Sequence, residues 1–205
     1  GMNLSSLARD EVCRNPNKEN EIEEVLSEKV YKKYLQLFNQ SKTLNFTPEL
    51  NGFGSTTHVS ILDKKGNAVS ITTTNGEGCG YIIPEYGIMM NNMLGEDDLN
   101  PFGFHKWNKK RRLPTMVSPI IIAKNSKPEF ILGSGGSNRI RSANVQVILN
   151  LLVHNMNLYD SISSPRIHLE GNTLFHEPGI KIPNQKINNM MLNSFNNKNV
   201  FKSRI

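Results

Sequence analysis

The sequence predicts an α+β fold in which β-hairpins and helices follow one another along a single chain. Two pairs of β-rich runs are each joined by turn-forming residues, and two other segments repeat apolar residues at helical spacing. A length of 205 residues is enough for one domain with a hydrophobic core. Hydrophobic residues make up 37% of the chain, and no window approaches the roughly 18 consecutive apolar residues of a membrane-spanning helix. We therefore expect no membrane span.

The first predicted element is an amphipathic helix over residues 20–38. Acidic residues lie early in this segment and lysines lie late, which suits the helix dipole, and apolar residues recur on one face. A polar connector and the glycines Gly52 and Gly54 follow. These breakers place a domain boundary near residue 55.

Two β-hairpins are predicted next. Residues 57–62 and 68–74 are β-rich and flank turn-forming residues 63–67. Residues 116–123 and 129–132 bracket a second turn, and the continuous apolar run at 120–123 indicates a strand that is covered on both faces.

The rest of the chain is predicted as helices followed by short strands. Apolar residues occur around much of a helix at 138–156, which indicates extensive burial. A short helix at 160–164 ends at Pro165, and β runs follow at 166–169 and 173–175. The asparagine-rich residues 184–199 are weakly specified.

Charge and cysteine content exclude several classes of function. The net charge is +6, and a basic run at 106–112 contributes much of it, but an isolated run of this kind is more often a solvated loop than a nucleic-acid site. We expect no nucleic-acid partner. The two cysteines, Cys13 and Cys79, form neither a disulfide framework nor a metal motif and are expected to be buried free thiols. No metal or cofactor is expected. No export signal is recognisable, so a cytoplasmic location follows if this is the full gene product.

Two threonine clusters could carry chemistry. Residues 54–60 contain Thr56 at the start of a strand, and by itself this pattern is typical of an ordinary strand start. A threonine that becomes an N-terminus, however, carries its own base, because its α-amine can accept the hydroxyl proton. Residues 72–78 end the return strand of the hairpin, and antiparallel pairing would bring the Thr74 hydroxyl beside Thr56. The alternative for that segment is a polar edge strand.

Two loops could bind charged groups. The glycine-rich residues 133–139 lie between a strand and a helix, so backbone N–H groups and the helix N-terminus could hold a phosphate or the oxyanion of acyl transfer. The phosphate-loop and dinucleotide fingerprints do not fit, which disfavours a nucleotide. Residues 91–101 form an acidic loop that either faces solvent or holds the ammonium group of an amino-acid substrate.

Taken in order, these segments resemble the small subunit of gamma-glutamyltranspeptidases, which are N-terminal-nucleophile hydrolases with an αββα sandwich. The resemblance covers about residues 54–179. It rests on the order and spacing of short motifs at residues 54–60, 63, 66–69, 72–74, 87–92, 118–119, 133–140 and 164–166.

The resemblance implies an acyltransferase or amidohydrolase of glutathione metabolism that is made as a zymogen. An autocatalytic cut before Thr56 would free the nucleophile that attacks a γ-glutamyl amide. Thr74 resembles the supporting hydroxyl, and Gly135 and Gly136 resemble the oxyanion-hole glycines, with Asn138 shifting the register by one residue. Three residues fall near the positions where family members hold the α-amino and α-carboxylate groups of the glutamyl substrate: Asn75, Asp98 and Thr115.

The resemblance also implies two regions and a partner. Residues 1–55 resemble the end of a large subunit and residues 56–205 a small-subunit domain, so only part of the sandwich is present. A lone small-subunit fold would expose an apolar sheet face, which we expect a large-subunit chain or a second copy to cover. Two alternative functions stay open: a catalytically inactive family member or assembly subunit, and a basic binding module.

Overall fold

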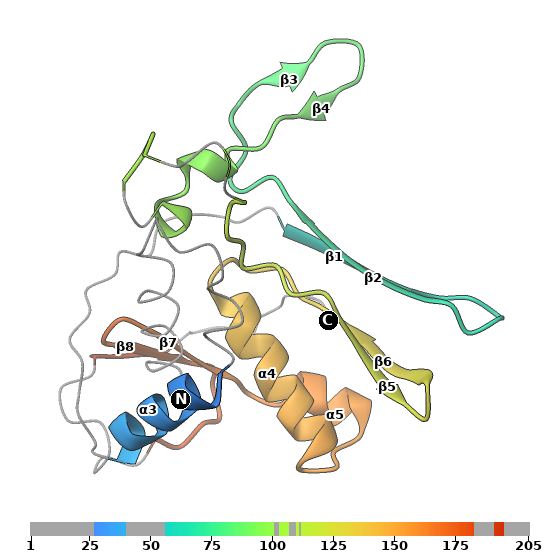
Figure 1. The fold of residues 1–205 in the computed structure, drawn as a ribbon, viewed down its shortest axis with the longest axis vertical. Helices are drawn as coiled ribbons and strands as arrows, with labels where there is room; N and C mark the ends of the chain where they lie inside the picture. Colours follow the sequence, from blue (N-terminus) through green and yellow to red (C-terminus); the bar gives the residue numbers. More distant parts are fainter. Residues whose placement is uncertain are drawn as a thin grey trace.

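The computed structural model describes residues 27–39, 56–100, 103–106, 110, 112–182 and 191–194. It contains both helices and strands, as the α+β prediction requires, and four small sheets (Figure 1). The elements are α3 (Glu28–Asn39), β1 (Thr56–Leu62), β2 (Ala68–Thr74), β3 (Ile82–Ile83), β4 (Ile88–Met89), η1 (Met93–Gly95), η2 (Asp97–Leu99), β5 (Ile120–Lys124), β6 (Lys127–Leu132), α4 (Arg139–Leu152), α5 (Leu158–Ser163), β7 (Ile167–Glu170), β8 (Thr173–His176) and β9 (Met191–Ser194).

Helix α3 confirms the second half of the helix predicted over residues 20–38, and the first half lies outside the described residues. Within α3, Lys32 lies 2.9 Å from Glu28 on the exposed face. Such an i,i+4 pair supports the helix weakly. None of the described helices is long and apolar enough to cross a membrane.

The first predicted hairpin is confirmed as β1 and β2, which pair antiparallel from Thr56 opposite Thr74 to Leu62 opposite Ala68. Its turn is fixed locally. The Asp63 carboxylate accepts backbone N–H bonds from Lys65 and Asn67, both at 2.8 Å, and Gly66 takes a left-handed φ of +87°. This turn sets the register and therefore decides which side chains share a face.

The two faces of the β1–β2 hairpin differ in polarity. Hydroxyl side chains and His58 occupy most of the face that meets β5 and β6, where Ser70 bridges the two hairpins. Its hydroxyl donates to the Leu132 carbonyl at 3.1 Å and accepts the Ile120 N–H at 3.1 Å. The opposite face is apolar beyond the pair Thr57 and Thr73, and its four aliphatic side chains are 41–52% exposed: Val59, Ile61, Val69 and Ile71.

The second hairpin forms between β5 and β6 but differs from the prediction in two ways. The first strand begins at Ile120 rather than at residue 116, since Pro119 lacks the N–H that a ladder needs. The turn is also tighter, because Asn125 and Ser126 both adopt left-handed backbone angles and Lys124 pairs with Lys127. The expected coverage on both faces was wrong, because Ile121 is 45% exposed.

Helix α4 is shorter and more amphipathic than predicted. It spans 139–152 instead of 138–156, and Val145, Leu149 and Leu152 are exposed rather than buried. Its buried face includes Ile140, which packs with Leu99 and Met116 in the main described core cluster. Apolar periodicity therefore marked the helix, whereas only the packing shows which part of its circumference is covered.

The C-terminal elements form a small sheet beside α4. Strands β7 and β8 confirm the predicted runs within one residue, and helix α5 confirms the short helix before Pro165. Its N-cap residue Asn157 accepts the Asp160 N–H at 2.9 Å. Strand β9, which pairs parallel to β8, was not predicted, because its residues lie in the asparagine-rich segment that lacks a clear pattern.

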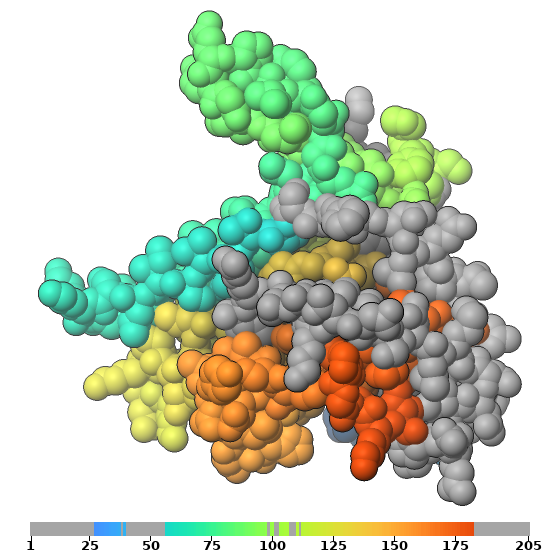
Figure 2. Space-filling view, turned by 180° about the vertical axis from the view of Figure 1, so that it is seen from behind, coloured from blue at the N-terminus to red at the C-terminus, as the bar shows by residue number. Residues whose placement is uncertain are grey.

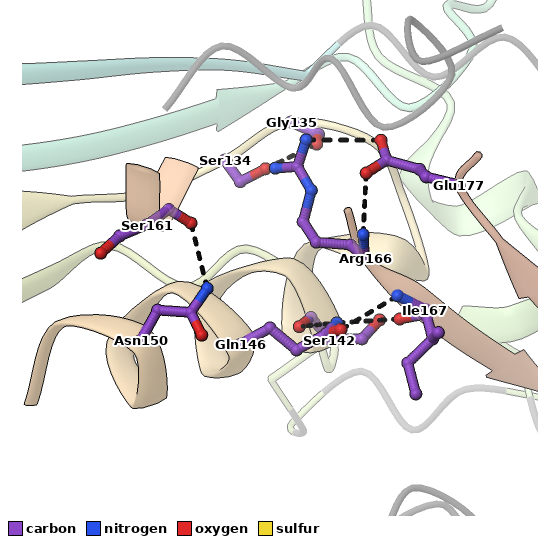
Figure 3. Close-up of polar contacts among 9 residues, drawn as sticks. All are labelled: Ser134, Gly135, Ser142, Gln146, Asn150, Ser161, Arg166, Ile167 and Glu177. Carbon is purple, nitrogen blue, oxygen red and sulfur yellow. Dashed lines mark hydrogen bonds and ion pairs between the residues drawn. The ribbon is translucent and has the colours of Figure 1, made fainter. Parts of the chain in front are cut away.

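A buried ion pair closes this sheet where β7 begins. The Glu177 carboxylate accepts the Arg166 backbone N–H at 2.8 Å and its guanidinium at 3.5 Å, and the two side chains are only 7% and 4% exposed (Figure 3). In Figure 3 the side chain of Arg166, the residue before β7, extends in the direction of the loop that carries Ser134 and Gly135.

We expect Arg166→Met to lower the free energy of unfolding by about 3–5 kcal/mol, because it leaves the Glu177 charge buried without its partner. Urea unfolding measures the change. The matched control is Lys124→Met, which breaks the exposed Lys124–Glu129 contact of 3.7 Å and should cost less than about 1 kcal/mol. Equal losses in the two variants would contradict this expectation.

Strands β3 and β4 form an arm that projects from the rest of the described chain (Figure 1 and Figure 2). Cys79 lies at its base and is exposed, so the expectation that this thiol is buried was wrong. Because the arm projects away from the other described elements, this thiol is left uncovered. Cys13 lies outside the described residues.

Candidate functional site

Thr56 begins β1 and faces Thr74 across the hairpin. The Thr56 hydroxyl donates to the Thr74 hydroxyl oxygen at 3.1 Å, and the Gly76 backbone N–H donates to the same oxygen at 3.0 Å. The two hydroxyls therefore meet as the antiparallel register predicts. The Thr74 oxygen therefore accepts from two donors, one of which is the Thr56 hydroxyl. Residues 51–55 lie outside the described part of the chain.

The glycine loop, residues 133–137, connects β6 to α4 and meets Thr56. A Cβ on Gly135 would lie 2.6 Å from the Thr56 carbonyl oxygen and 3.5 Å from the Thr56 Cβ. Only glycine permits this approach of the two backbones. Gly136 and Ser137 take left-handed φ angles of +119° and +53° before α4 begins. The loop therefore packs against the backbone and Cβ of Thr56 shortly before α4 begins, and peptide N–H groups before a helix can stabilise negative charge.

His58 is a neighbour of this site that sequence reasoning did not select. It shares the Thr56 face of β1, and its Nδ1 and Nε2 lie 2.7 Å from Thr72 Oγ1 and 2.9 Å from Ser60 Oγ. Its ring contacts Gly133 so closely that any side chain there would collide with it. The period of two along a strand is the signal that could have placed it on the Thr56 face.

Partial burial lowers the pKa of His58 below its ordinary value of 6.5 because it disfavours the charged imidazolium. We expect an NMR titration to show this depression. The unfolded chain then binds the proton more readily, so stability present above about pH 6.5 is lost as the pH falls below it. The urea midpoint of the wild-type protein should fall more between about pH 7.5 and pH 5.5 than that of His58→Gln. An equal fall in both proteins would rule this out.

Two of the residues expected to bind substrate, Asp98 and Thr115, are each adjacent in sequence to a residue that packs against the start of α4. Leu99 and Met116 pack on Ile140 in the first turn of α4, and they adjoin Asp98 and Thr115 in sequence. Asp98 lies in η2, and its side chain is outside the described atoms. Thr115 is exposed, and its hydroxyl accepts the Val117 N–H at 3.3 Å.

Asn75, the third such residue, joins the end of β2 to the acidic loop. Its backbone carbonyl accepts the N–H groups of Gly78 at 2.9 Å and of Asn92 at 3.1 Å, and its side chain is exposed. Asn92 in turn accepts the Glu77 N–H at 2.7 Å through its side-chain oxygen. The acidic loop is therefore held beside the segment that follows Thr74. Gly76 contacts the Asn92 and Glu96 side chains closely enough to exclude a Cβ.

A second polar cluster lies where the glycine loop ends and α4 begins. Sequence reasoning also missed this cluster. Asn138 donates to the Glu170 carboxylate at 2.6 Å, and the His168 Nε2 lies 3.6 Å from the same carboxylate. Burial alone would raise the pKa of Glu170, but the nearby His168 ring, the hydrogen bond from Asn138 and the charge of Arg139 outweigh burial, so its pKa lies below the ordinary value of 4.5. Glu170 is therefore an anion near neutral pH.

No group of three or more His, Cys, Asp or Glu side chains in the described ranges is arranged to hold a metal ion. The chemistry that the site can perform with its own groups is acyl transfer. The Thr56 hydroxyl is hydrogen-bonded to a second hydroxyl, and the glycine loop that leads into α4 packs against the same residue.

Comparisons with known proteins find a matching family profile and similar sequences. The sequence profile of the Gamma-glutamyltranspeptidase family matches residues 2–196. Glutathione hydrolase proenzyme from Bacillus subtilis is 34% identical over 130 residues, which are 62% of this chain and 22% of that protein. Acylase ACY 1 proenzyme from a Pseudomonas species is 34% identical over 148 residues, which are 70% of this chain and 26% of that protein.

The fold is also found among solved structures. A mutant of gamma-glutamyltranspeptidase from Helicobacter pylori superposes with a TM-score of 0.57 and 28% identity, over 68% of this chain and 84% of the matched chain. This chain spans about a fifth to a quarter of the length of the curated relatives it matches. Because the family profile matches nearly the whole sequence, the chain belongs to the gamma-glutamyltranspeptidase family.

Proposed function

We propose that this chain carries the nucleophile of an enzyme that cleaves γ-glutamyl amides, with Thr56 attacking the amide carbonyl. The observation that carries the proposal is the meeting of three groups from distant parts of the chain: the Thr56 hydroxyl, the Thr74 hydroxyl and the glycine loop at Gly135. Each belongs to a different segment, and the contact between them needs both a fixed hairpin register and a residue without a side chain in the loop.

The proposed activation is a cut between Ser55 and Thr56. The Thr56 oxygen attacks the Ser55 carbonyl carbon, the peptide C–N bond breaks as the nitrogen gains a proton, and water hydrolyses the resulting ester. Thr56 is then an N-terminus, and its α-amine is free to accept the hydroxyl proton. The name proenzyme, which the Bacillus subtilis and Pseudomonas relatives bear, supports a precursor that is processed. A further similar structure, 28% identical, is described in terms of autoprocessing and catalysis.

The proposed cleavage of the γ-glutamyl amide uses the same groups, Thr56 and the glycine loop. The Thr56 hydroxyl transfers its proton to the α-amine as its oxygen attacks the γ-carbonyl carbon. The backbone N–H groups of the glycine loop stabilise the oxyanion, and each such donor contributes roughly 3–4 kcal/mol. The departing amine takes the proton, leaving a γ-glutamyl ester on Thr56, and water or an acceptor amine releases the glutamyl group. Asn75, Asp98 and Thr115 are proposed to hold the α-amino and α-carboxylate groups.

Intact mass spectrometry tests the first step of this proposal. The purified protein is expected to separate into fragments 1–55 and 56–205, which are the two proposed regions. Hydrolysis of a chromogenic γ-glutamyl anilide tests the second step. A chain that stays uncut and inactive would instead support the alternative of an inactive family member or assembly subunit.

We also propose that a complementary large-subunit chain covers the apolar face of the β1–β2 hairpin. Its aliphatic side chains point outward while hydroxyl groups face the rest of the structure, the reverse of the usual arrangement. Covering this face recovers about 25 cal/mol per Å² of apolar surface. Sedimentation tests this proposal by comparing the oligomeric state of the wild-type protein with that of Ile61→Ser, in which a polar side chain replaces an apolar one on this face. A monomer at micromolar concentration that does not bind an apolar dye would count against the proposal, and self-association would identify a second copy as the occupant.

A further inference from the structure

A row of polar side chains runs along one face of α4 and docks the helix on β7 and α5. The residues are four apart, so they lie one above another on successive turns. Near the far end of the row, Gln146 brackets the backbone of Ile167, donating to its carbonyl at 2.8 Å and accepting its N–H at 2.9 Å (Figure 3). The row and its partners are Asn138 with Glu170, Ser142 with His168, Gln146 with Ile167, and Asn150 with Ser161.

The Glu170 end of the row lies directly after the glycine loop. One Glu170 oxygen accepts the Asn138 amide at 2.6 Å, and the other lies 3.6 Å from His168, whose Nδ1 meets the Ser142 hydroxyl at 2.6 Å. The Glu170 side chain is only 13% exposed. Arg139 is electrostatically coupled to the same carboxylate. One carboxylate therefore accepts a hydrogen bond from the residue before α4 and acts electrostatically on the first residue of the helix.

The glycine loop, which precedes Asn138 and Arg139 in the chain, has a strained backbone. Ser137 adopts φ +53°, a left-handed angle that is unfavourable for a residue with a side chain, and Gly136 before it adopts +119°. Among the described residues, two backbone bonds close the turn, from the Arg139 N–H to the Gly136 carbonyl at 3.2 Å and from the Ile140 N–H to the Ser137 carbonyl at 3.1 Å. Such a conformation persists only when its surroundings fix it.

We propose that Glu170 is a positioning residue which, through Asn138, holds the glycine loop against Thr56. This inference rests on the proposed function, because the loop matters for turnover only if its N–H groups stabilise the oxyanion at Thr56. Glu170 touches neither Thr56 nor the glycine N–H groups. Its effect is on their geometry, and small displacements of such donors are costly because charge stabilisation depends on distance and direction.

Steady-state kinetics on a γ-glutamyl anilide provide the first test. Glu170→Ala is expected to lower kcat about 10- to 100-fold while KM changes less than about threefold, since the donors act on the transition state. Glu170→Gln keeps an oxygen for Asn138 and should restore most of kcat. The matched control is Asn150→Ala, which removes the last contact of the same row, three turns away from the loop. It should lower the melting temperature but leave kcat unchanged.

Amide hydrogen exchange provides a readout that needs no turnover. Exchange at the Arg139 and Ile140 amides, which donate to the Gly136 and Ser137 carbonyls, should accelerate in Glu170→Ala and equally in Asn138→Ala, which removes the same hydrogen bond from the other side. The double variant should exchange no faster than either single one. Unchanged exchange in these variants, or the same kcat loss in Asn150→Ala, would overturn the inference. If the wild-type protein lacks turnover, the proposed function fails, and the exchange experiment alone decides the role of Glu170.

Discussion

Thr56→Ala is expected to leave the chain as one uncut polypeptide and to reduce hydrolysis of a γ-glutamyl anilide by at least about 10³-fold. The substitution removes the oxygen that would attack first the Ser55 carbonyl and then the substrate. It also removes the donor to Thr74, but that bond lies in a half-buried hairpin, so the fold should persist. Intact mass and initial rates measure the two losses separately.

Thr57→Ala is the matched control for this prediction. Thr57 is the next residue and the same residue type, but it lies on the opposite face of β1, paired with Thr73, and is exposed. The control should be cut and should turn over at the wild-type rate. If both variants were cut normally, Thr56 would not be the nucleophile. If both were inactive, the requirement would lie in the strand and not in the Thr56 hydroxyl.

Gly135→Ala is expected to lower kcat about 10²- to 10³-fold, comparable to the loss of an oxyanion donor. The new methyl group would lie 2.6 Å from the Thr56 carbonyl oxygen, which is a backbone atom and cannot rotate away. The glycine loop must therefore shift away from Thr56. Overpacking of this kind also lowers the free energy of unfolding by about 1–3 kcal/mol.

Gly66→Ala is the control that separates the stability effect of Gly135→Ala from its effect on kcat. Gly66 lies in the β1–β2 turn at φ +87°, and a Cβ there would meet no atom within 4 Å. The variant should lose about 1–2 kcal/mol of stability through backbone strain alone. Its kcat should equal that of the wild-type protein. A wild-type kcat in Gly135→Ala would show that the close approach of the loop to Thr56 is unnecessary for turnover.

The hairpin that presents Thr56 could be predicted because its information is local. Asp63 and Gly66 specify the turn, the turn fixes the register, and the register places Thr74 opposite Thr56. The glycine loop could likewise be located between a strand and a helix from residues 133–139. In both cases residues close in sequence determine the backbone conformation, so pattern and turn chemistry suffice.

Predictions of burial were less successful, because burial depends on which distant elements pack over a segment. The apolar run at 120–123 resembled a doubly covered strand, yet Ile121 is 45% exposed, and the apolar residues of α4 extend onto an exposed face. Apolar composition shows that a segment forms part of a core, but it does not show how many neighbours cover it. The exposure of Cys79 has the same cause.

The sequence by itself determined the α+β elements, the family, the Thr56 and Thr74 pairing and the existence of a glycine loop, because each follows from short-range patterns or from the order of motifs. Only the tertiary structure decided that Gly135 lies against Thr56, that His58 contacts Gly133, and that Glu170 holds Asn138. These contacts join residues 32 to 79 positions apart, as the numbering shows. Such contacts form only when whole hairpins and helices pack together, and no local propensity encodes that packing.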